Sequence, residues 1–141
     1  MTSDALYHEA LVRLARRSEA PRRLARRDGS ATRDNPLCGD EVTFDVRVTN
    51  GRIAELGQRV RGCALCQAAT TILAAAAPGL GRAELDHARA ALRALLDGGG
   101  APDGRFAELA VFTPVRAVPS RHGCVLLPFD ALADALARAG G

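Results

Sequence analysis

The sequence lacks any apolar run long enough to span a membrane. Its longest mostly apolar stretch, Ile72 to Ala77, ends at Pro78, whereas a transmembrane helix takes about 20 residues. The first residues do not combine a basic segment with an apolar core, so they do not form a secretory signal. We therefore expect a soluble, cytoplasmic protein that has no membrane partner.

Lysine and tryptophan are also absent, and aromatic residues make up only 4% of the chain. All 19 basic residues are arginine, which fits the codon bias of a GC-rich genome and says little about mechanism. Residues 1–33 hold eight of these arginines and four acidic residues, a net charge of +4. This small excess without aromatic stacking platforms argues against nucleic acid binding. The arginines are typical of a solvated face, or of one that steers an acidic partner toward the protein.

The length and the hydrophobic content of the chain predict one globular domain. The 141 residues fit a single domain spanning 1–141. Hydrophobic residues make up 48% and charged residues 25%, close to the average of soluble globular proteins. The chain is therefore long and apolar enough to bury a core.

Alternation of apolar residues predicts a β-hairpin. Residues 41–49 alternate strictly and residues 52–60 form the return strand, with Gly57 as a candidate bulge. Asn50-Gly51 between them is a strong signal for a two-residue hairpin turn. Helical periodicity over 4–17, 63–77, 82–96 and 128–139 predicts four helices. We expect a loop over 18–37, with at most a short helical or strand piece, and a loop over 101–123 with one short apolar piece from Leu109 to Phe112. The predicted fold class is α+β, a small antiparallel sheet with helices packed on it.

Three of the four cysteines lie where the predicted backbone turns. Cys38 precedes the first predicted strand, Cys63 opens a helix, and Cys124 lies in a loop before the last helix. Side chains at the ends of elements converge more easily than those within elements, and a helix N-terminus lowers the pKa of a thiol. In a reducing compartment, clustered cysteines indicate metal or thiol chemistry rather than disulfides.

The order of these motifs resembles the NifU N-terminal/IscU/SufU family of iron–sulfur cluster assembly scaffolds and sulfur acceptors. The resemblance rests on Asn35-Pro36-Leu37-Cys38-Gly39-Asp40, the hairpin, Gly62-Cys63-Ala64-Leu65 opening an Ala/Thr-rich helix, and Cys124 before the last helix. The opening helix with Leu6-Tyr7 is also similar to that of the family. The match covers nearly the whole chain and implies the family's fold and function.

Details of spacing resemble the SufU type within the family. Cys63 and Cys124 lie 61 positions apart, which implies an insert over the Gly98–Val111 region. Gly123 stands directly before the last cysteine, where IscU-type members carry a histidine, and Arg121 matches the arginine of SufU-type members. This resemblance implies a zinc site with four ligands, namely Cys38, Asp40, Cys63 and Cys124.

The implied function is cluster assembly, either as a non-enzymatic scaffold or as a zinc-dependent sulfurtransferase. The implied cofactor is zinc or a [2Fe-2S] cluster, and the implied partners are a SufS-like cysteine desulfurase and downstream cluster-accepting proteins. Cys124 is the implied sulfur acceptor, and Arg121 is a candidate for ligand exchange. Three thiolates and a carboxylate suit tetrahedral zinc, and the harder carboxylate is the ligand that is released most readily.

Other interpretations of the same residues stay open. Asp40 could simply begin the strand or cap a turn, and His122 is typical of a solvated loop residue. Cys66 fits helix packing, an auxiliary thiol or an alternative ligand. A structural zinc module for protein or nucleic acid interaction is one alternative function. A thiol redox enzyme using Cys63 and Cys66 is another, although no βαβ pattern surrounds this CxxC.

Overall fold

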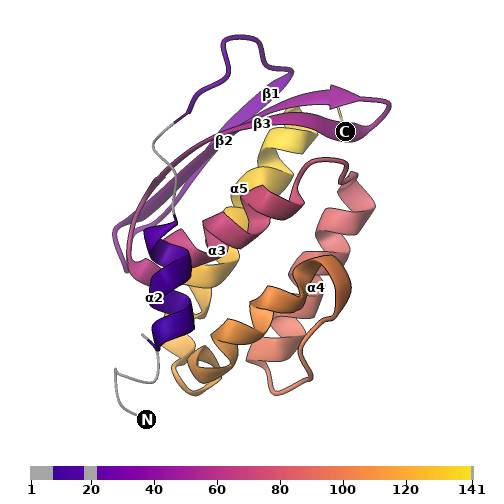
Figure 1. Cartoon of the computed structure of the whole chain (residues 1–141). Helices are drawn as coiled ribbons and strands as arrows, with labels where there is room; N and C mark the ends of the chain where they lie inside the picture. Colours follow the sequence, from indigo (N-terminus) through magenta and orange to yellow (C-terminus); the bar gives the residue numbers. More distant parts are fainter. Residues whose placement is uncertain (1–7, 18–21, 141) are drawn as a thin grey trace.

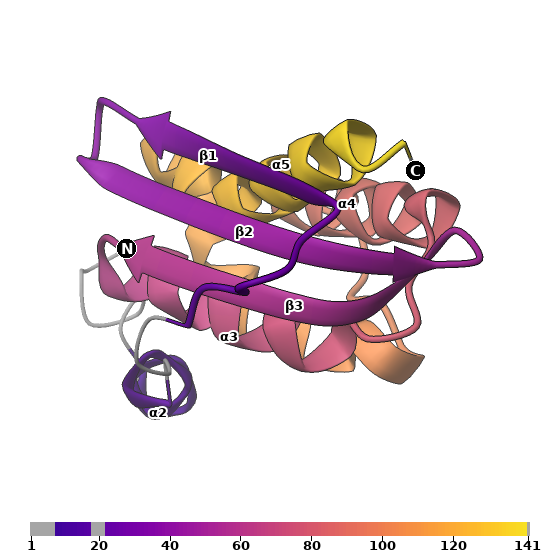
Figure 2. The same cartoon turned by 90° about the horizontal axis from the view of Figure 1, so that it is seen from above.

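The computed structural model describes residues 8–17 and 22–140 (Figure 1). Three strands form one antiparallel sheet in the order β1-β2-β3: β1 (Gly29–Asn35), β2 (Asp40–Thr49) and β3 (Arg52–Arg61). The helical elements are α2 (Glu9–Arg16), α3 (Ala64–Ala76), α4 (Arg82–Leu96), the 3-10 segments η1 (Gly104–Ala117) and η2 (Pro119–Arg121), and α5 (His122–Arg138). The α-helices gather on one face of the sheet (Figure 1, Figure 2), which confirms the predicted α+β class.

The predicted hairpin forms as expected. Strands β2 and β3 pair antiparallel, and Asn50 and Gly51 adopt φ of 53° and 75°, the left-handed backbone that a tight two-residue turn requires. Val42, Phe44 and Val46 point from β2 into the core and are fully buried. The predicted bulge is wrong, because Gly57 pairs regularly with Asp45. The register instead shifts between Arg47 and Val48.

Strand β1 lies in the 18–37 segment, for which the sequence predicts a loop with at most a short helical or strand piece, and it is longer than that prediction allows. It pairs along its whole length with β2, and α5 packs against it. Its sequence, Gly29 to Asn35, is mostly polar and buries only Gly29 and Ala31 fully. Alternating hydrophobicity is therefore absent, and the strand is specified by its partner β2 and by contacts to α5, among them the 2.7 Å hydrogen bond from Arg33 Nε to Asp134 Oδ2.

Helix α5 begins at His122, six residues before the predicted start at residue 128. Pro128 lies inside this helix rather than in its first turn, although it lacks the N–H that would bond to the carbonyl of Cys124. The stretch from Val125 to Phe129 is buried throughout, and this burial compensates for the missing hydrogen bond. Cys124 consequently lies in the first turn of a helix and not in a loop.

The predicted loop over 101–123 also contains ordered helical turns. In η1 the buried side chains of Leu109, Phe112 and Val115 recur every three residues, which is the period of a 3-10 helix. The backbone is non-helical at Phe106, so η1 is two pieces joined at a kink. Segment η1 packs against α3 and α4 and closes the core on the side away from the sheet.

The described part of the first predicted helix starts at Glu9, with His8 as its N-cap. Leu11 and Leu14 are buried as predicted, whereas Ala10 is exposed and Ala15 is buried in its place. Leu6 and Tyr7 lie outside the described residues. In the described ranges no helix has the length and apolar character needed to cross a membrane.

On the other face of the sheet, residues 22–28 run from the edge of β3 across to the start of β1 (Figure 2). This segment covers Asp45, which has no exposed surface. The carboxylate accepts hydrogen bonds from Arg23 Nε at 2.7 Å, Ser30 Oγ at 2.6 Å and the Leu24 amide at 3.0 Å. Burial raises the pKa of Asp45, but these hydrogen bonds and the Arg23 charge outweigh it, so the pKa lies well below its ordinary value.

Candidate metal centre

The candidate centre forms where three distant parts of the chain meet. Cys38 lies in the turn between β1 and β2, Asp40 begins β2, and Cys124 lies in the first turn of α5. The two sulfurs and a carboxylate oxygen all lie within 4.8 Å of one another. The Sγ atoms of Cys38 and Cys124 are 2.9 Å apart. In the described part of the chain, no other group of potential metal ligands gathers as closely.

Cys63 joins this group through Asp40. Its backbone amide donates to Asp40 Oδ1 at 2.8 Å, and its Sγ lies 3.6 Å from Asp40 Oδ2. The carboxylate is 1% exposed. A Cβ on Gly62 would lie 2.6 Å from Asp40 Oδ1, so only glycine leaves room for the carboxylate. Gly62 therefore leaves space for the Asp40 carboxylate. Its position in the sequence before Cys63 did not indicate this role.

A tight turn positions Cys38 at the rim of the centre. The Asn35 carbonyl accepts hydrogen bonds from the amides of Cys38 at 3.1 Å and Gly39 at 2.8 Å, and Asn35 Oδ1 accepts from the Leu37 amide at 3.2 Å. Leu37, at the tip of this turn, is 89% exposed. Asn35 therefore fixes the turn, while Leu37 faces outward beside the thiol.

The pKa values of Cys63 and Cys124 are shifted in opposite directions. Contact with the Cys124 thiol lowers the pKa of Cys63 to about 7 against the opposing effect of burial, and the Cys66 amide and the Arg121 charge lower it further. The same contact, together with burial, raises the pKa of Cys124. The Cys63 thiol therefore ionises more readily than the Cys124 thiol.

These residues fit a soft or borderline metal. Three sulfurs, one of them readily ionised, and a buried carboxylate provide four donors, the number of a tetrahedral zinc site. Cysteine thiolates are also the usual ligands of iron–sulfur clusters. All four cysteines of the chain are free thiols. The structure therefore brings together Cys38, Asp40, Cys63 and Cys124, and their roles as ligands remain a prediction.

The other predicted site residues lie around this group. Arg121 ends η2, directly before α5, and its charge acts on Cys63. His122 is half-buried and its Nε2 lies 3.1 Å from the Val115 carbonyl oxygen, outside the cluster of ligand atoms. Cys66 is fully buried in α3, and burial raises the pKa of its thiol. Burial of Cys66 fits helix packing, one of its predicted roles, and its roles as an auxiliary thiol or an alternative ligand stay predictions.

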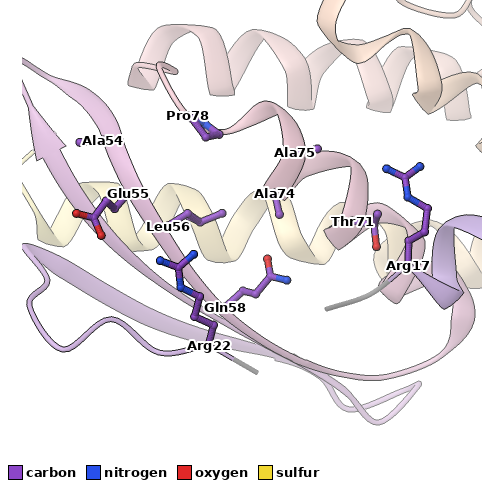
Figure 3. A pocket seen from close by; sticks show the side chains of 10 residues that line it. All are labelled: Arg17, Arg22, Ala54, Glu55, Leu56, Gln58, Thr71, Ala74, Ala75 and Pro78. Carbon is purple, nitrogen blue, oxygen red and sulfur yellow. The ribbon is translucent and has the colours of Figure 1, made fainter. Parts of the chain in front are cut away.

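A pocket of about 390 Å³ lies apart from the centre, between α3 and β3 (Figure 3). Arginines line it together with small and apolar side chains, and none of its lining residues is a cysteine; they are Arg17, Arg22, Ala54, Glu55, Leu56, Gln58, Thr71, Ala74, Ala75 and Pro78. Figure 3 shows Arg17 and Arg22 at separate places along it rather than aimed at one point. The pocket is therefore not part of the cysteine centre.

Comparison with known proteins gives a consistent assignment. The family model of the NifU-like N terminal domain matches residues 15–94. A NifU-like protein (N-terminal) from Brucella abortus is 35% identical, with a TM-score of 0.92 over 98% of this chain and 96% of its own. An iron–sulfur cluster assembly scaffold protein for the SUF system from Fervidobacterium islandicum shares the fold at 23% identity, with a TM-score of 0.85 over 96% of this chain and 99% of its own.

The curated protein sequences include no match to this chain. The family resemblance noted in the sequence is confirmed, whereas its SufU subtype stays a prediction, since the NifU-like structure is the more similar of the two in sequence. The chain belongs to the NifU-like N-terminal domain family, the iron–sulfur cluster assembly scaffolds.

Proposed function

We propose that this protein is a cytoplasmic iron–sulfur cluster assembly protein whose Cys38, Asp40, Cys63 and Cys124 bind zinc or a [2Fe-2S] cluster. The single observation that carries the proposal is the convergence of these side chains. The Cys38 and Cys124 sulfurs and an Asp40 oxygen lie within 4.8 Å of one another, and the Cys63 sulfur lies 3.6 Å from Asp40 Oδ2. Burial of Asp40 supports a ligand role, because a buried carboxylate requires compensation by partners or by a cation.

Within this function, we infer that a SufS-like cysteine desulfurase delivers sulfur to Cys124. The Cys124 thiolate attacks the outer sulfur of the desulfurase persulfide, the sulfur–sulfur bond of the persulfide breaks, and the desulfurase thiolate leaves. Bound zinc would hold the cysteines as thiolates. Arg121, one turn before Cys124, places a positive charge beside the reacting sulfurs. Downstream cluster-accepting proteins would then receive the product.

Burial of Cys124 sets the condition for this transfer. Its side chain has no exposed surface, so it must leave the shared centre before a partner can reach it. A site with one carboxylate among three thiolates exchanges ligands more easily than one with four thiolates. Arg121 is well placed to hold the displaced group, because it ends η2 directly before α5 and its charge acts on Cys63.

Metal analysis and a sulfur-transfer assay test the proposal. We expect about one zinc ion per chain in colourless protein if sulfur acceptance is the main function, and brown protein with cluster absorbance if scaffolding is. The protein should stimulate a cysteine desulfurase, and Cys124→Ala should abolish this stimulation. Ser120→Ala is the matched control, because Ser120 is exposed and lies four positions before Cys124. Full stimulation by Cys124→Ala would exclude Cys124 as the acceptor.

A further inference from the structure

Cys66 is a fourth thiol next to the centre that the proposed function does not use. Cys63 is the N-cap of α3, with an extended backbone, and its carbonyl accepts the Gln67 amide at 3.0 Å. Cys66 is the third residue of the helix, one turn after Cys63. Side chains three positions apart lie on the same face of a helix. The two cysteines therefore lie on one helical turn.

The two thiols differ in their access to solvent. Cys63 is half-buried at the rim of the centre, whereas Cys66 is fully buried in the core behind it. A persulfide carried by a partner protein cannot reach Cys66. Sulfur that has already entered the centre can reach it through Cys63. The Cys63 sulfur lies 3.6 Å from Asp40 Oδ2, the Asp40 carboxylate lies within 4.8 Å of the Cys124 sulfur, and Cys66 follows Cys63 by one helical turn. Cys66 thus has the position of a resolving thiol, which reacts only with a group bound to its neighbour.

Resting on the proposed function, we propose that Cys66 reduces the transferred sulfur to sulfide by closing a disulfide with Cys63. First the Cys63 thiolate attacks the outer sulfur of the Cys124 persulfide, which leaves Cys63 as the persulfide and Cys124 as the thiolate. Next the Cys66 sulfur attacks the inner sulfur of Cys63, the persulfide bond breaks, and the outer sulfur leaves as hydrogen sulfide with the Cys66 proton. The two cysteine sulfurs each lose one electron, and the sulfur atom that is released gains both.

The local backbone allows this disulfide with a small movement. Side chains three positions apart on a helix have Cβ atoms about 5–6 Å apart, and a disulfide needs about 3.5–4.5 Å. Closing it takes a shift of about 1 Å, and Cys63 can supply it because its own backbone is extended rather than helical. A metal on Cys63 would occupy the sulfur that Cys66 attacks, so the step follows release of Cys63. A dithiol reductant then restores both thiols for the next turnover.

A single-turnover experiment with glutathione persulfide tests this role without a desulfurase. The full-length protein is loaded under anaerobic conditions and freed of small thiols by gel filtration, and the sulfide released per chain is measured. We expect about one sulfide per chain and a Cys63–Cys66 disulfide in the peptide mass spectrum. Cys66→Ser and Cys66→Ala should retain the persulfide and release sulfide at least about tenfold more slowly, because they lose an oriented intramolecular nucleophile.

The alternative outcomes separate this inference from the proposed function. If the persulfide loads but the natural protein releases sulfide as slowly as Cys66→Ala, Cys66 has no resolving role, while sulfur acceptance stands. If neither glutathione persulfide nor a desulfurase loads any variant, both proposals are wrong. A disulfide between Cys63 and Cys124 in place of Cys63–Cys66 would also overturn the assignment. Circular dichroism of the two Cys66 variants establishes that a loss of release does not reflect unfolding.

Discussion

Asp40 accepts a hydrogen bond at the start of α3, and a single substitution can separate this contact from its proposed role as a metal ligand. One oxygen accepts the Cys63 amide and so caps α3, while the other faces the sulfurs of the centre. Capping needs only an oxygen, whereas holding a cation also needs the negative charge. Asparagine at this position would keep the first role and weaken the second, which gives a clean variant for testing the metal site.

We expect Asp40→Asn to lower zinc affinity at least about tenfold, since even outer partners of metal ligands contribute 10- to 100-fold. The metal-free variant should keep nearly the stability of the natural protein, whereas Asp40→Ala should lose about 1 kcal/mol more through the missing cap. Competition with a chromophoric chelator measures the affinity, and urea denaturation measures the stability. Unchanged zinc affinity in Asp40→Asn would remove Asp40 from the ligand set.

Asp45 is the second buried carboxylate that the sequence left without a role. It ties the 22–28 segment to the sheet through Arg23, Ser30 and the Leu24 amide. We expect Asp45→Asn to destabilise the protein by about 2–4 kcal/mol at pH 7, because it removes charge-assisted hydrogen bonds from a buried group. Urea denaturation measures the change. Asp34→Asn, at an exposed aspartate in β1, should change stability by less than about 0.5 kcal/mol.

The stabilisation by Asp45 should depend on pH in a defined direction. Its pKa is lower in the folded protein than in the unfolded chain, where an aspartate titrates near about 3.9. The contribution is therefore complete above that value and is lost as the pH falls toward the folded-state pKa. The stability difference between the natural protein and Asp45→Asn should be constant from pH 7 to about pH 5 and shrink below about pH 4. A difference that grows on acidification would contradict this assignment.

At the scale of elements, the turn between β1 and β2 places the exposed side chain of Leu37 next to Cys38 of the centre. Single exposed apolar side chains are common on protein surfaces, but Leu37 is adjacent in sequence to Cys38 at the rim of the centre. A partner that delivers sulfur to the centre has to approach this rim. Leu37 would then lie at the middle of the contact, where apolar anchors contribute most to binding.

We expect Leu37→Ser to weaken desulfurase binding by about 1–2 kcal/mol, because it removes apolar area from the contact. Leu37→Ile, which keeps that area, should bind within about twofold of the natural protein. Titration calorimetry with the desulfurase gives both affinities, and zinc content shows that the centre is intact. Equal affinity of all three proteins would place the partner away from this turn.

Elements specified by a local sequence pattern could be predicted, whereas elements specified by tertiary contacts could not. The hairpin was predictable because apolar alternation and Asn50-Gly51 agree in register and turn type. Strand β1 was not, because its polar residues are held by β2 and α5. The 3-10 segment η1 buries residues at a period of three, which a search for helical period 3.6 overlooks. Pro128 suggested a helix start, but burial of the preceding residues extends α5 back to His122.

The proposed ligand set came from the family resemblance, whereas the residues alone indicated only that cysteines at ends of elements can converge. The fold brings Cys38, Cys63 and Cys124 to one region, and their roles as ligands stay a prediction. The distances among them, the burial of Cys124 and the contact of Asp40 with the Cys63 amide depend on packing of α3 against α5, which no local pattern encodes. Cys66 followed from helical spacing alone, as it lies one turn from Cys63 and faces the core.

At the scale of the whole molecule, the centre lies where the sheet meets two of the helices that pack on it. Cys38 and Asp40 belong to the sheet, Cys63 begins α3, and Cys124 begins α5. A metal bound by all four would connect the sheet to both helices that pack on it. These residues are far apart in sequence, so only the folded chain holds them close together in space. Such a metal therefore binds the folded state preferentially and stabilises it.

Metal removal should therefore lower the thermal stability of the whole protein. A ligand present at about a thousandfold over its dissociation constant stabilises a fold by about 4 kcal/mol. For a chain of this size we expect a chelator to lower the melting temperature by about 10 °C. Cys124→Ser, which loses a thiolate, should start at the lower temperature and shift little on chelation, whereas Ser120→Ala should behave as the natural protein. Scanning calorimetry with and without chelator measures the melting temperatures. Equal shifts of the melting temperature in Cys124→Ser and the natural protein would mean that the metal binds elsewhere.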